Sequence, residues 1–453
     1  MKRKIIPFIT AVIFMICTVP APDVSAVTFK PGFTLNSKAA VMVNLDTGET
    51  IFEQNASKKM YPASFTKIVT ALVVLDNVDD LENTYFEAPS AVFDELYMTG
   101  ALTVGYQKGE TISVQDLMYS MLIYSACESA GILAYNVGGG SIPNFVDMMN
   151  KKVEEIGCTG TNFVNPHGLH DRSQYTNAND IALITEYALE NYPEFEEIAC
   201  TSEYTLGATN YNPAGWMTIS HSNKMTNPAS EYYYEGAKGI KTGTMDESGR
   251  NLVSMAEKND RRYLLVTMGA PMYDEEENPV YGSYIDQINL YDWAFDTISY
   301  RQIIPAGQEI TEVQVKMGTD KDYVRLVTAE SRSMYWSSDI DIDKLKVTIN
   351  TEGYTDEDGS ITAPIEEGQK LGTYSLSLNG EEIASVDLVA QESISLSHVR
   401  YNLEKAKEFF GSFWFKAAFG TAILLVVGYV LILVFVAGKK KKKRKKVRRE
   451  RRF

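Results

Sequence analysis

A long apolar segment near the C-terminus constrains this chain more than any other feature. Residues 417–437 are uncharged and mostly apolar, and residues 439–453 contain twelve Lys/Arg and one Glu. In a helix that rises about 1.5 Å per residue, these 21 residues span about 31 Å, which is enough to cross a bilayer core. A buried core helix fits poorly with a terminal position beside a basic run. We therefore predict a transmembrane helix at 417–437 and a cytoplasmic basic tail at 438–453.

The N-terminus has the pattern of a secretory signal. Residues 2–4 are basic, residues 5–19 are apolar, and Val24-Ser25-Ala26 is a run of small residues typical of a cleavage site. We predict a signal peptide at 1–26, with an uncleaved anchor as the alternative. Both ends together predict a cell-membrane protein that crosses the bilayer once and holds its body on the extracytoplasmic side.

The body between these ends is acidic and poor in cysteine. The net charge is −16, and because residues 439–453 contribute +11 and residues 1–26 contribute +2, the remaining 412 residues carry −29. This acidity argues against a nucleic-acid partner. The body has three cysteines and no C-x-x-C pair, so free thiols are favoured, with a Cys158–Cys200 bridge as the alternative.

Hydrophobic periodicity predicts an α+β domain at 27–304. Residues 39–53 alternate around an Asp-Thr-Gly turn and predict two strands, and further strands are expected at 251–255 and 262–268. Helical periodicity occurs between them, most clearly at 143–156 and 177–190. Strands at both ends with helices between them predict an antiparallel sheet that is closed by distant segments and covered by helices.

Residues 305–395 differ in character from the preceding domain. Short alternating runs are separated by Gly- and Asp-rich turns, which predicts a small all-β sandwich domain that serves as a spacer or interaction module. We then predict an amphipathic juxtamembrane helix at 396–416. Its apolar stripe contains Val399, Leu403, Ala406, Phe410 and Trp414.

Three short motifs carry chemistry-bearing side chains. Ser64 precedes Lys67 by three residues, so on a helix both side chains lie on one face, where a lysine of lowered pKa can take the proton of a serine. Ser125-Ala126-Cys127 begins a helical stretch, and the motif Lys241-Thr242-Gly243-Thr244 is expected on a strand. Each motif alone is weak. In this order they match the S-x-x-K, S-x-N-like and K-T-G set of penicillin-binding proteins and serine β-lactamases.

With these motifs the chain resembles the serine D-alanyl-D-alanine carboxypeptidases, the low-molecular-weight penicillin-binding proteins. The segment from Asn162 to Leu169, with the letters NFVNPHGL, and Gly239-Ile240 before the K-T-G motif also look like signatures of that family. The resemblance covers roughly residues 30–395 and is most specific over 30–270. It implies a β-lactamase/transpeptidase-like domain, a trailing β-domain and C-terminal membrane attachment.

The resemblance also implies roles for individual residues. Ser64 would attack the carbonyl between two D-alanines of a peptidoglycan stem peptide, Lys67 would act as general base, and Ser125 would relay the proton to the leaving D-alanine. The backbone N–H groups of Ser64 and Thr244 would form the oxyanion hole. Lys241 would hold the terminal carboxylate. The substrate-binding set comprises Lys241, Thr242, Gly243, Thr244 and Cys127.

The implied reaction needs no metal and no organic cofactor. Its partners would be the stem peptide, β-lactams as covalent inhibitors, and membrane lipid around the C-terminal helix. Cys127 occupies the position where the family usually has Asn, and a thiol is a weaker donor and acceptor than an amide. We interpret Cys127 as a substituted site residue and not as a second nucleophile.

Several alternatives remain at this point. The same core could act as a D,D-endopeptidase, as a β-lactamase, or as a catalytically weak protein that binds wall peptide, but the chain has no Glu-x-x-Leu-Asn segment of the kind that class A β-lactamases use. His167 and His170 could be metal ligands or a triad base, although structural roles are favoured. Residues 232–234, all tyrosine, could line a substrate groove or pack within a loop.

Overall fold

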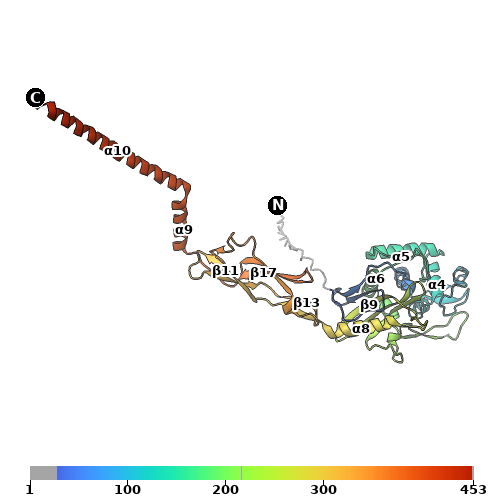
Figure 1. The fold of residues 1–453 in the computed structure, drawn as a ribbon. Helices are drawn as coiled ribbons and strands as arrows, with labels where there is room; N and C mark the ends of the chain where they lie inside the picture. Colours follow the sequence, from blue (N-terminus) through green and yellow to red (C-terminus); the bar gives the residue numbers. More distant parts are fainter. Residues whose placement is uncertain (1–27, 216, 451–453) are drawn as a thin grey trace, which may run out of the picture. The chain divides into compact units, whose positions relative to one another are not determined.

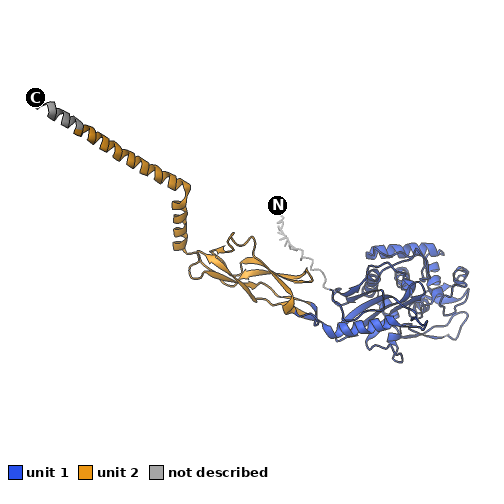
Figure 2. Ribbon diagram, in the orientation of Figure 1, with its two compact units in different colours: residues 1–300, 335–341 blue, residues 301–334, 342–453 orange. Residues whose placement is uncertain are grey.

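The computed structural model describes residues 28–215 and 217–450. The predicted signal peptide at 1–26 and the last residues of the predicted tail lie outside this range. The chain divides into two compact units, which are coloured separately in Figure 2: residues 1–300 with 335–341, and residues 301–334 with 342–453. The return of 335–341 to the first unit was not anticipated from the sequence.

The first unit is built on a five-stranded antiparallel sheet with the strand order β2-β1-β9-β8-β7. The N-terminal strand pairs with a strand more than 200 residues later, for example Val41 with Val266, so the prediction of a sheet closed by distant segments is confirmed. β7 lies at the edge of the sheet, where it contacts helical segments. The five strands are β1 (Ala39–Asn44), β2 (Thr50–Gln54), β7 (Ala237–Met245), β8 (Gly249–Lys258) and β9 (Arg261–Ala270).

Helices pack on this sheet, and α6 (Ala178–Asn191) and α8 (Gly282–Thr297) lie on opposite sides of β9 in Figure 1. α1 (Thr66–Leu75) is the most buried helix, because every residue except Leu75 is shielded from solvent. The predicted helix at 143–156 is confirmed as α5 (Ile142–Ile156), whose first turn is capped by the Ser141 hydroxyl. The remaining elements are α2 (Ser90–Leu96), α3 (Val114–Tyr119), α4 (Cys127–Val137), α7 (Pro193–Ala199), β3 (Tyr85–Glu87), β4 (Thr111–Ser113), β5 (Glu203–Thr205) and β6 (Thr218–Ser220).

Short non-α turns join some of these elements. η1 (Ala63–Phe65) is a 3₁₀ turn directly before α1, and η2 (Ser120–Tyr124) is a π-turn between α3 and α4. η3 (Lys224–Thr226) follows β6. Ser64 is the central residue of η1, and Ser125 directly follows the last residue of η2.

The second unit is all-β up to its C-terminal helices, as predicted. Six strands are hydrogen-bonded in the order β14-β16-β17-β12-β11-β15, and the chain passes between the units within β10, within β13 and again between residues 341 and 342. Val324, Leu326 and Leu388 are fully buried in its core. The strands are β10 (Ile298–Ile304), β11 (Glu309–Lys316), β12 (Tyr323–Thr328), β13 (Arg332–Ser337), β14 (Lys346–Asn350), β15 (Ile361–Thr362), β16 (Lys370–Leu378) and β17 (Glu381–Ala390).

The C-terminal helices differ from the prediction of one amphipathic helix over 396–416. α9 (His398–Gly411) ends earlier, and α10 (Phe413–Glu450) begins two residues later. The break lies at Ser412, which has an extended backbone and whose hydroxyl accepts a hydrogen bond from the Phe415 N–H, as an N-cap residue does. Over residues 413–441, α10 is long and apolar enough to cross a membrane.

Candidate active site

The first feature of the site is a fully buried lysine in contact with the candidate nucleophile. Lys67 Nζ lies 3.1 Å from Ser64 Oγ, 2.6 Å from the carbonyl oxygen of His167 and 3.4 Å from Cys127 Sγ. Lys67 has no exposed surface, whereas Ser64 is half-buried. The structure therefore brings together three of the residues selected from the sequence, although Cys127 is 60 positions from Lys67.

The loop from Asn162 to Leu169 packs directly on the nucleophile turn. Gly168 has a φ of +89°, and a Cβ at this position would lie 1.9 Å from the Ala63 carbonyl oxygen, so only glycine fits. The Thr70 hydroxyl donates to the Pro166 carbonyl at 2.7 Å. These contacts fix the His167 carbonyl beside Lys67.

The imidazole of His167 is engaged away from Ser64. Its Nε2 lies 3.2 Å from Glu95 Oε1, and its Nδ1 accepts a hydrogen bond from the Leu169 N–H, so both ring nitrogens have partners. Burial lowers the pKa of His167 below its usual value. His170 packs edge-on against Tyr61. These positions fit structural roles, and no group of three metal-ligating side chains occurs within the described residues.

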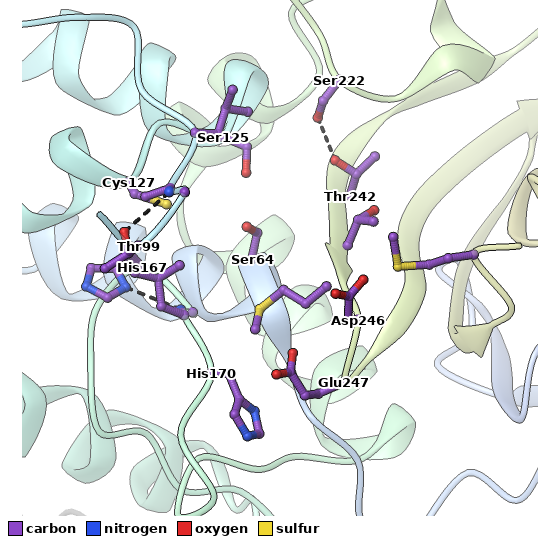
Figure 3. Close-up of a pocket in the computed structure, with 18 residues that line it drawn as sticks. Ser64, Thr99, Ser125, Cys127, His167, His170, Ser222, Thr242, Asp246 and Glu247 are labelled. Atoms are coloured by element: carbon purple, nitrogen blue, oxygen red, sulfur yellow. Dashed lines mark hydrogen bonds between the residues drawn. The ribbon is translucent and has the colours of Figure 1, made fainter. Parts of the chain in front are cut away.

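Ser125 is held by an unusual backbone turn. It follows the π-turn η2 in the left-handed conformation, with φ 76°, and the residue is 7% exposed, at the cavity surface. Figure 3 shows its hydroxyl directed toward Ser64. The turn is secured by Ser120, whose carbonyl accepts from the Ala126 N–H and whose hydroxyl contacts Ser129.

The segment after Ser125 fixes a loop at the mouth of the site. The Cys127 N–H donates to the Leu102 carbonyl, and one carboxylate oxygen of Glu128 accepts from the N–H groups of Val104 and Gly105. Burial raises the pKa of Glu128 above its usual value. The loop residues from Thr99 to Leu102 line the cavity, which the sequence analysis missed.

β7 forms the opposite side of the cavity. Gly243 passes so close to the nucleophile turn that a Cβ would lie 3.2 Å from the Pro62 carbonyl oxygen and 3.3 Å from Ala63 Cβ. The Thr242 and Thr244 side chains line the cavity, and the Thr242 hydroxyl lies 2.7 Å from the hydroxyl of Ser222. Ser222 is a further cavity residue that no sequence motif indicated.

Lys241, which we expected to hold the substrate carboxylate, is enclosed beside the cavity. Its side chain is fully buried, and its Nζ donates to the Thr242 carbonyl at 3.1 Å. Burial, together with the positive charge of Lys67, holds the pKa of Lys241 well below its usual value. Burial and the Lys241 charge likewise lower the pKa of the neighbouring His221 to about 4.

These residues enclose a cavity of about 700 Å³ (Figure 3). Asp246 and Glu247 reach its rim, whereas the tyrosines at 232–234 are not part of its lining. Tyr232 instead packs against Tyr284, and Tyr234 donates to Asp292. The lining residues are Ser64, Thr99, Gly100, Ala101, Leu102, Ser125, Cys127, His167, Gly168, Leu169, His170, Ser222, Thr242, Thr244, Met245, Asp246, Glu247 and Met272.

The Ser64 hydroxyl, the buried Lys67 amine and a second hydroxyl, that of Ser125, meet at one cavity, and this arrangement is suited to acyl transfer. The D-alanyl-D-alanine carboxypeptidase family model matches residues 25–272, and the model of the C-terminal domain of penicillin-binding protein 5 matches residues 299–395. The chain belongs to the D-alanyl-D-alanine carboxypeptidase family, as its motifs predicted.

Individual relatives agree over most of the chain. The D-alanyl-D-alanine carboxypeptidase DacF of Bacillus subtilis is 28% identical over 365 residues, which cover 79% of this chain and 86% of the relative. DacA of Haemophilus influenzae is 28% identical over 393 residues, covering 82% and 89%. The crystal structure of penicillin-binding protein 5 from Haemophilus influenzae has a TM-score of 0.54 at 25% identity and covers 81% of this chain and 99% of its own.

Proposed function

We propose that this protein removes the terminal D-alanine from peptidoglycan stem peptides through an acyl-enzyme on Ser64. The observation that carries the proposal is the contact of 3.1 Å between the Ser64 hydroxyl and the fully buried Lys67 amine. A serine becomes a strong nucleophile only when a neighbouring base removes its proton.

In the first step, Ser64 Oγ attacks the carbonyl carbon of the penultimate D-alanine. The hydroxyl proton passes to Lys67 Nζ and is then delivered by the Ser125 hydroxyl to the departing amide nitrogen, so that the C–N bond breaks and D-alanine leaves. The burial of Ser125 at the cavity surface, with its hydroxyl directed toward Ser64, supports this relay.

The negative oxygen of the intermediate would be bound by the backbone N–H groups of Ser64 and Thr244. The close approach of β7 supports this assignment, because a Cβ on Gly243 would lie only 3.4 Å from the Ser64 nitrogen. Water then cleaves the ester and restores the Ser64 hydroxyl. β-lactams acylate the same serine and act as covalent inhibitors.

The substrate-binding side is formed by the K-T-G strand and by Cys127. The Thr242 and Thr244 hydroxyls reach the substrate, Gly243 permits its close approach to Ser64, and Lys241 supports the strand from behind the Thr242 carbonyl. Cys127 completes the surroundings of Lys67.

We also infer how the chain is organised. A signal peptide at 1–26 is removed, a catalytic domain at 27–304 and a β-domain at 305–395 lie outside the cell membrane, and α10 anchors them among membrane lipids with the tail in the cytoplasm. The apolar character of α10 over residues 413–441 and the basic run after it support this topology.

The test compares the full-length protein in detergent with its Ser64→Ala variant. Each is incubated with a peptide that ends in D-Ala-D-Ala, and free D-alanine is assayed. The proposal predicts release by the wild type and none by the variant. Release by both proteins, or a folded wild type that neither releases D-alanine nor is acylated by penicillin, contradicts it.

A further inference from the structure

A carboxypeptidase must recognise a free C-terminal carboxylate, and this recognition needs a positive charge. None of the described residues that line the cavity is a lysine or an arginine. Lys241 has no exposed surface and directs its amine to the Thr242 carbonyl. The charge that meets the carboxylate therefore has to come from residues beside the cavity.

Two such cations lie over one tyrosine ring. Lys224 Nζ is 3.9 Å and Arg250 Cζ is 4.1 Å from the ring centroid of Tyr281. Arg250 Nε donates to the Val280 carbonyl at 2.6 Å, which orients the guanidinium. This arrangement, which we call the Tyr281 cation pair, combines two positive charges on a preorganised aromatic surface.

The pair adjoins the part of the cavity that is rich in hydroxyl groups. Arg250 in β8 is directly opposite Thr244 in β7, so both side chains project from the same face of the sheet, as does that of Thr242 two residues earlier. Lys224 follows Ser222 by two residues, and Ser222 contacts the Thr242 hydroxyl.

The phenol of Tyr284 connects Ser222, at the cavity, with Lys224 of the Tyr281 cation pair. It donates to the Ser222 carbonyl and accepts from the Lys224 N–H, with both distances at 3.4 Å. Tyr284 also stacks on Tyr232, which closes the cluster from the loop side.

The charges of the pair are uncompensated. Across the described residues, neither Lys224 nor Arg250 forms an ion pair with a carboxylate, whereas Lys238 in β7 is paired with Glu257. A pair of cations without acidic partners is available to an incoming carboxylate.

We propose that Lys224 and Arg250 select the free C-terminal carboxylate of the substrate, which the Thr242 and Thr244 hydroxyls place between them and Ser64. The inference rests on the proposed carboxypeptidase function and assigns its carboxylate specificity to a cation pair that lies outside the K-T-G motif.

The experiment compares two substrates on the full-length protein in detergent: diacetyl-L-Lys-D-Ala-D-Ala and the same peptide with a C-terminal amide. Release of D-alanine and of D-alaninamide is measured for the wild type, Lys224→Gln, Arg250→Gln, Arg250→Lys and the double glutamine variant. Arg262→Gln serves as the matched control, because Arg262 is half-exposed, pairs with Asp46 and takes no part in the cavity.

We expect loss of each cation to raise KM for the acid roughly tenfold, which is the strength of one charge-assisted hydrogen bond, and to leave the amide reaction unchanged. Arg250→Lys should retain part of the preference for the acid over the amide, and Arg262→Gln should retain all of this preference. Lys224→Gln changes an exposed side chain, so its effect cannot be attributed to misfolding.

An active wild type whose preference for the acid persists in the double variant would overturn this inference alone. Equal KM increases for the acid and the amide would overturn it as well, since they indicate a structural role. A wild type that releases no D-alanine would overturn the proposed function and this inference with it.

Discussion

Lys67 and Lys241 approach the same cavity from opposite sides, are equally buried, and have different surroundings. Lys67 contacts the Ser64 hydroxyl, the Cys127 thiol and the His167 carbonyl, whereas Lys241 has one hydrogen-bond partner among the described residues, the Thr242 carbonyl. The helical side of the cavity, formed by α1 and the segments around Ser64, thus places the Lys67 amine against the Ser64 hydroxyl. The strand side, formed by β7, encloses the Lys241 amine within the protein. Burial alone does not assign a catalytic role; the contacts of each amine do.

The largest effect is expected on the helical side. Lys67→Met should slow acylation of Ser64 by penicillin about a thousandfold, because among the described residues no other base contacts the serine hydroxyl. Stopped-flow or mass-spectrometric measurement of the acylation rate checks this. Lys238→Met, which removes a half-exposed lysine paired with Glu257, is the matched control and should leave the rate unchanged. Equal acylation rates for wild type and Lys67→Met would contradict the assignment of Lys67, and not Lys241, as the base that acts on Ser64.

The packing of the loop from Asn162 to Leu169 against the turn that carries Ser64 depends on Gly168. Gly168→Ala should lower the free energy of unfolding by about 3 kcal/mol and slow acylation, because the new methyl group would collide with the Ala63 carbonyl next to Ser64. Urea denaturation of the full-length protein in detergent measures the stability. Gly48→Ala is the control, since Gly48 also has a positive φ but no neighbour within 4 Å, and it should cost only about 1 kcal/mol. Similar losses for both variants would mean that the close packing of this loop is unimportant.

Next to Lys241 on the strand side, His221 should make the free energy of unfolding depend on pH. His221 has a pKa of about 4 in the folded protein against 6.5 in the unfolded chain, so the unfolded state binds the proton more readily. Its contribution is present above pH 6.5 and is lost as the pH falls from 6.5 to 4, up to about 3 kcal/mol. His221→Gln should remove this part of the acid destabilisation in denaturation curves from pH 4 to 8. Parallel curves for the two proteins would contradict the prediction.

The smallest effect is expected for the thiol. Cys127→Ala should slow acylation by less than about tenfold, because Lys67 keeps its contacts with Ser64 and the His167 carbonyl. The acylation rate with penicillin again measures this. Complete loss of acylation in a folded Cys127→Ala variant would make the thiol part of the chemistry and would contradict our interpretation of Cys127 as a substituted site residue.

Much of the helical side could be predicted, because its signals are local or match a known order of motifs. The three-residue spacing of Ser64 and Lys67 predicted one face, and the structure confirms their contact. The antiparallel sheet also followed from strand patterns at both ends of the first domain. The junction between α9 and α10 was missed, since one serine cap at Ser412 interrupts an otherwise continuous helical pattern.

The strand side was harder to predict, because its properties arise from tertiary contacts. Nothing in the sequence around Lys241 reveals that its amine is enclosed, and Ser222 belongs to no motif. Lys224, Arg250 and Tyr281 come from three separate segments, so their association is visible only in the fold. The left-handed Ser125 after a π-turn likewise has no sequence signal.

The proposed mechanism requires that Ser64 is the residue that becomes acylated. The most direct measurement traps the full-length protein with penicillin, digests it, and locates the added mass by tandem mass spectrometry. We expect one adduct, on Ser64, and none in the Lys67→Met variant over the same time. An adduct on Ser125 or Cys127, or release of D-alanine by a protein in which Ser64 is never modified, would contradict it.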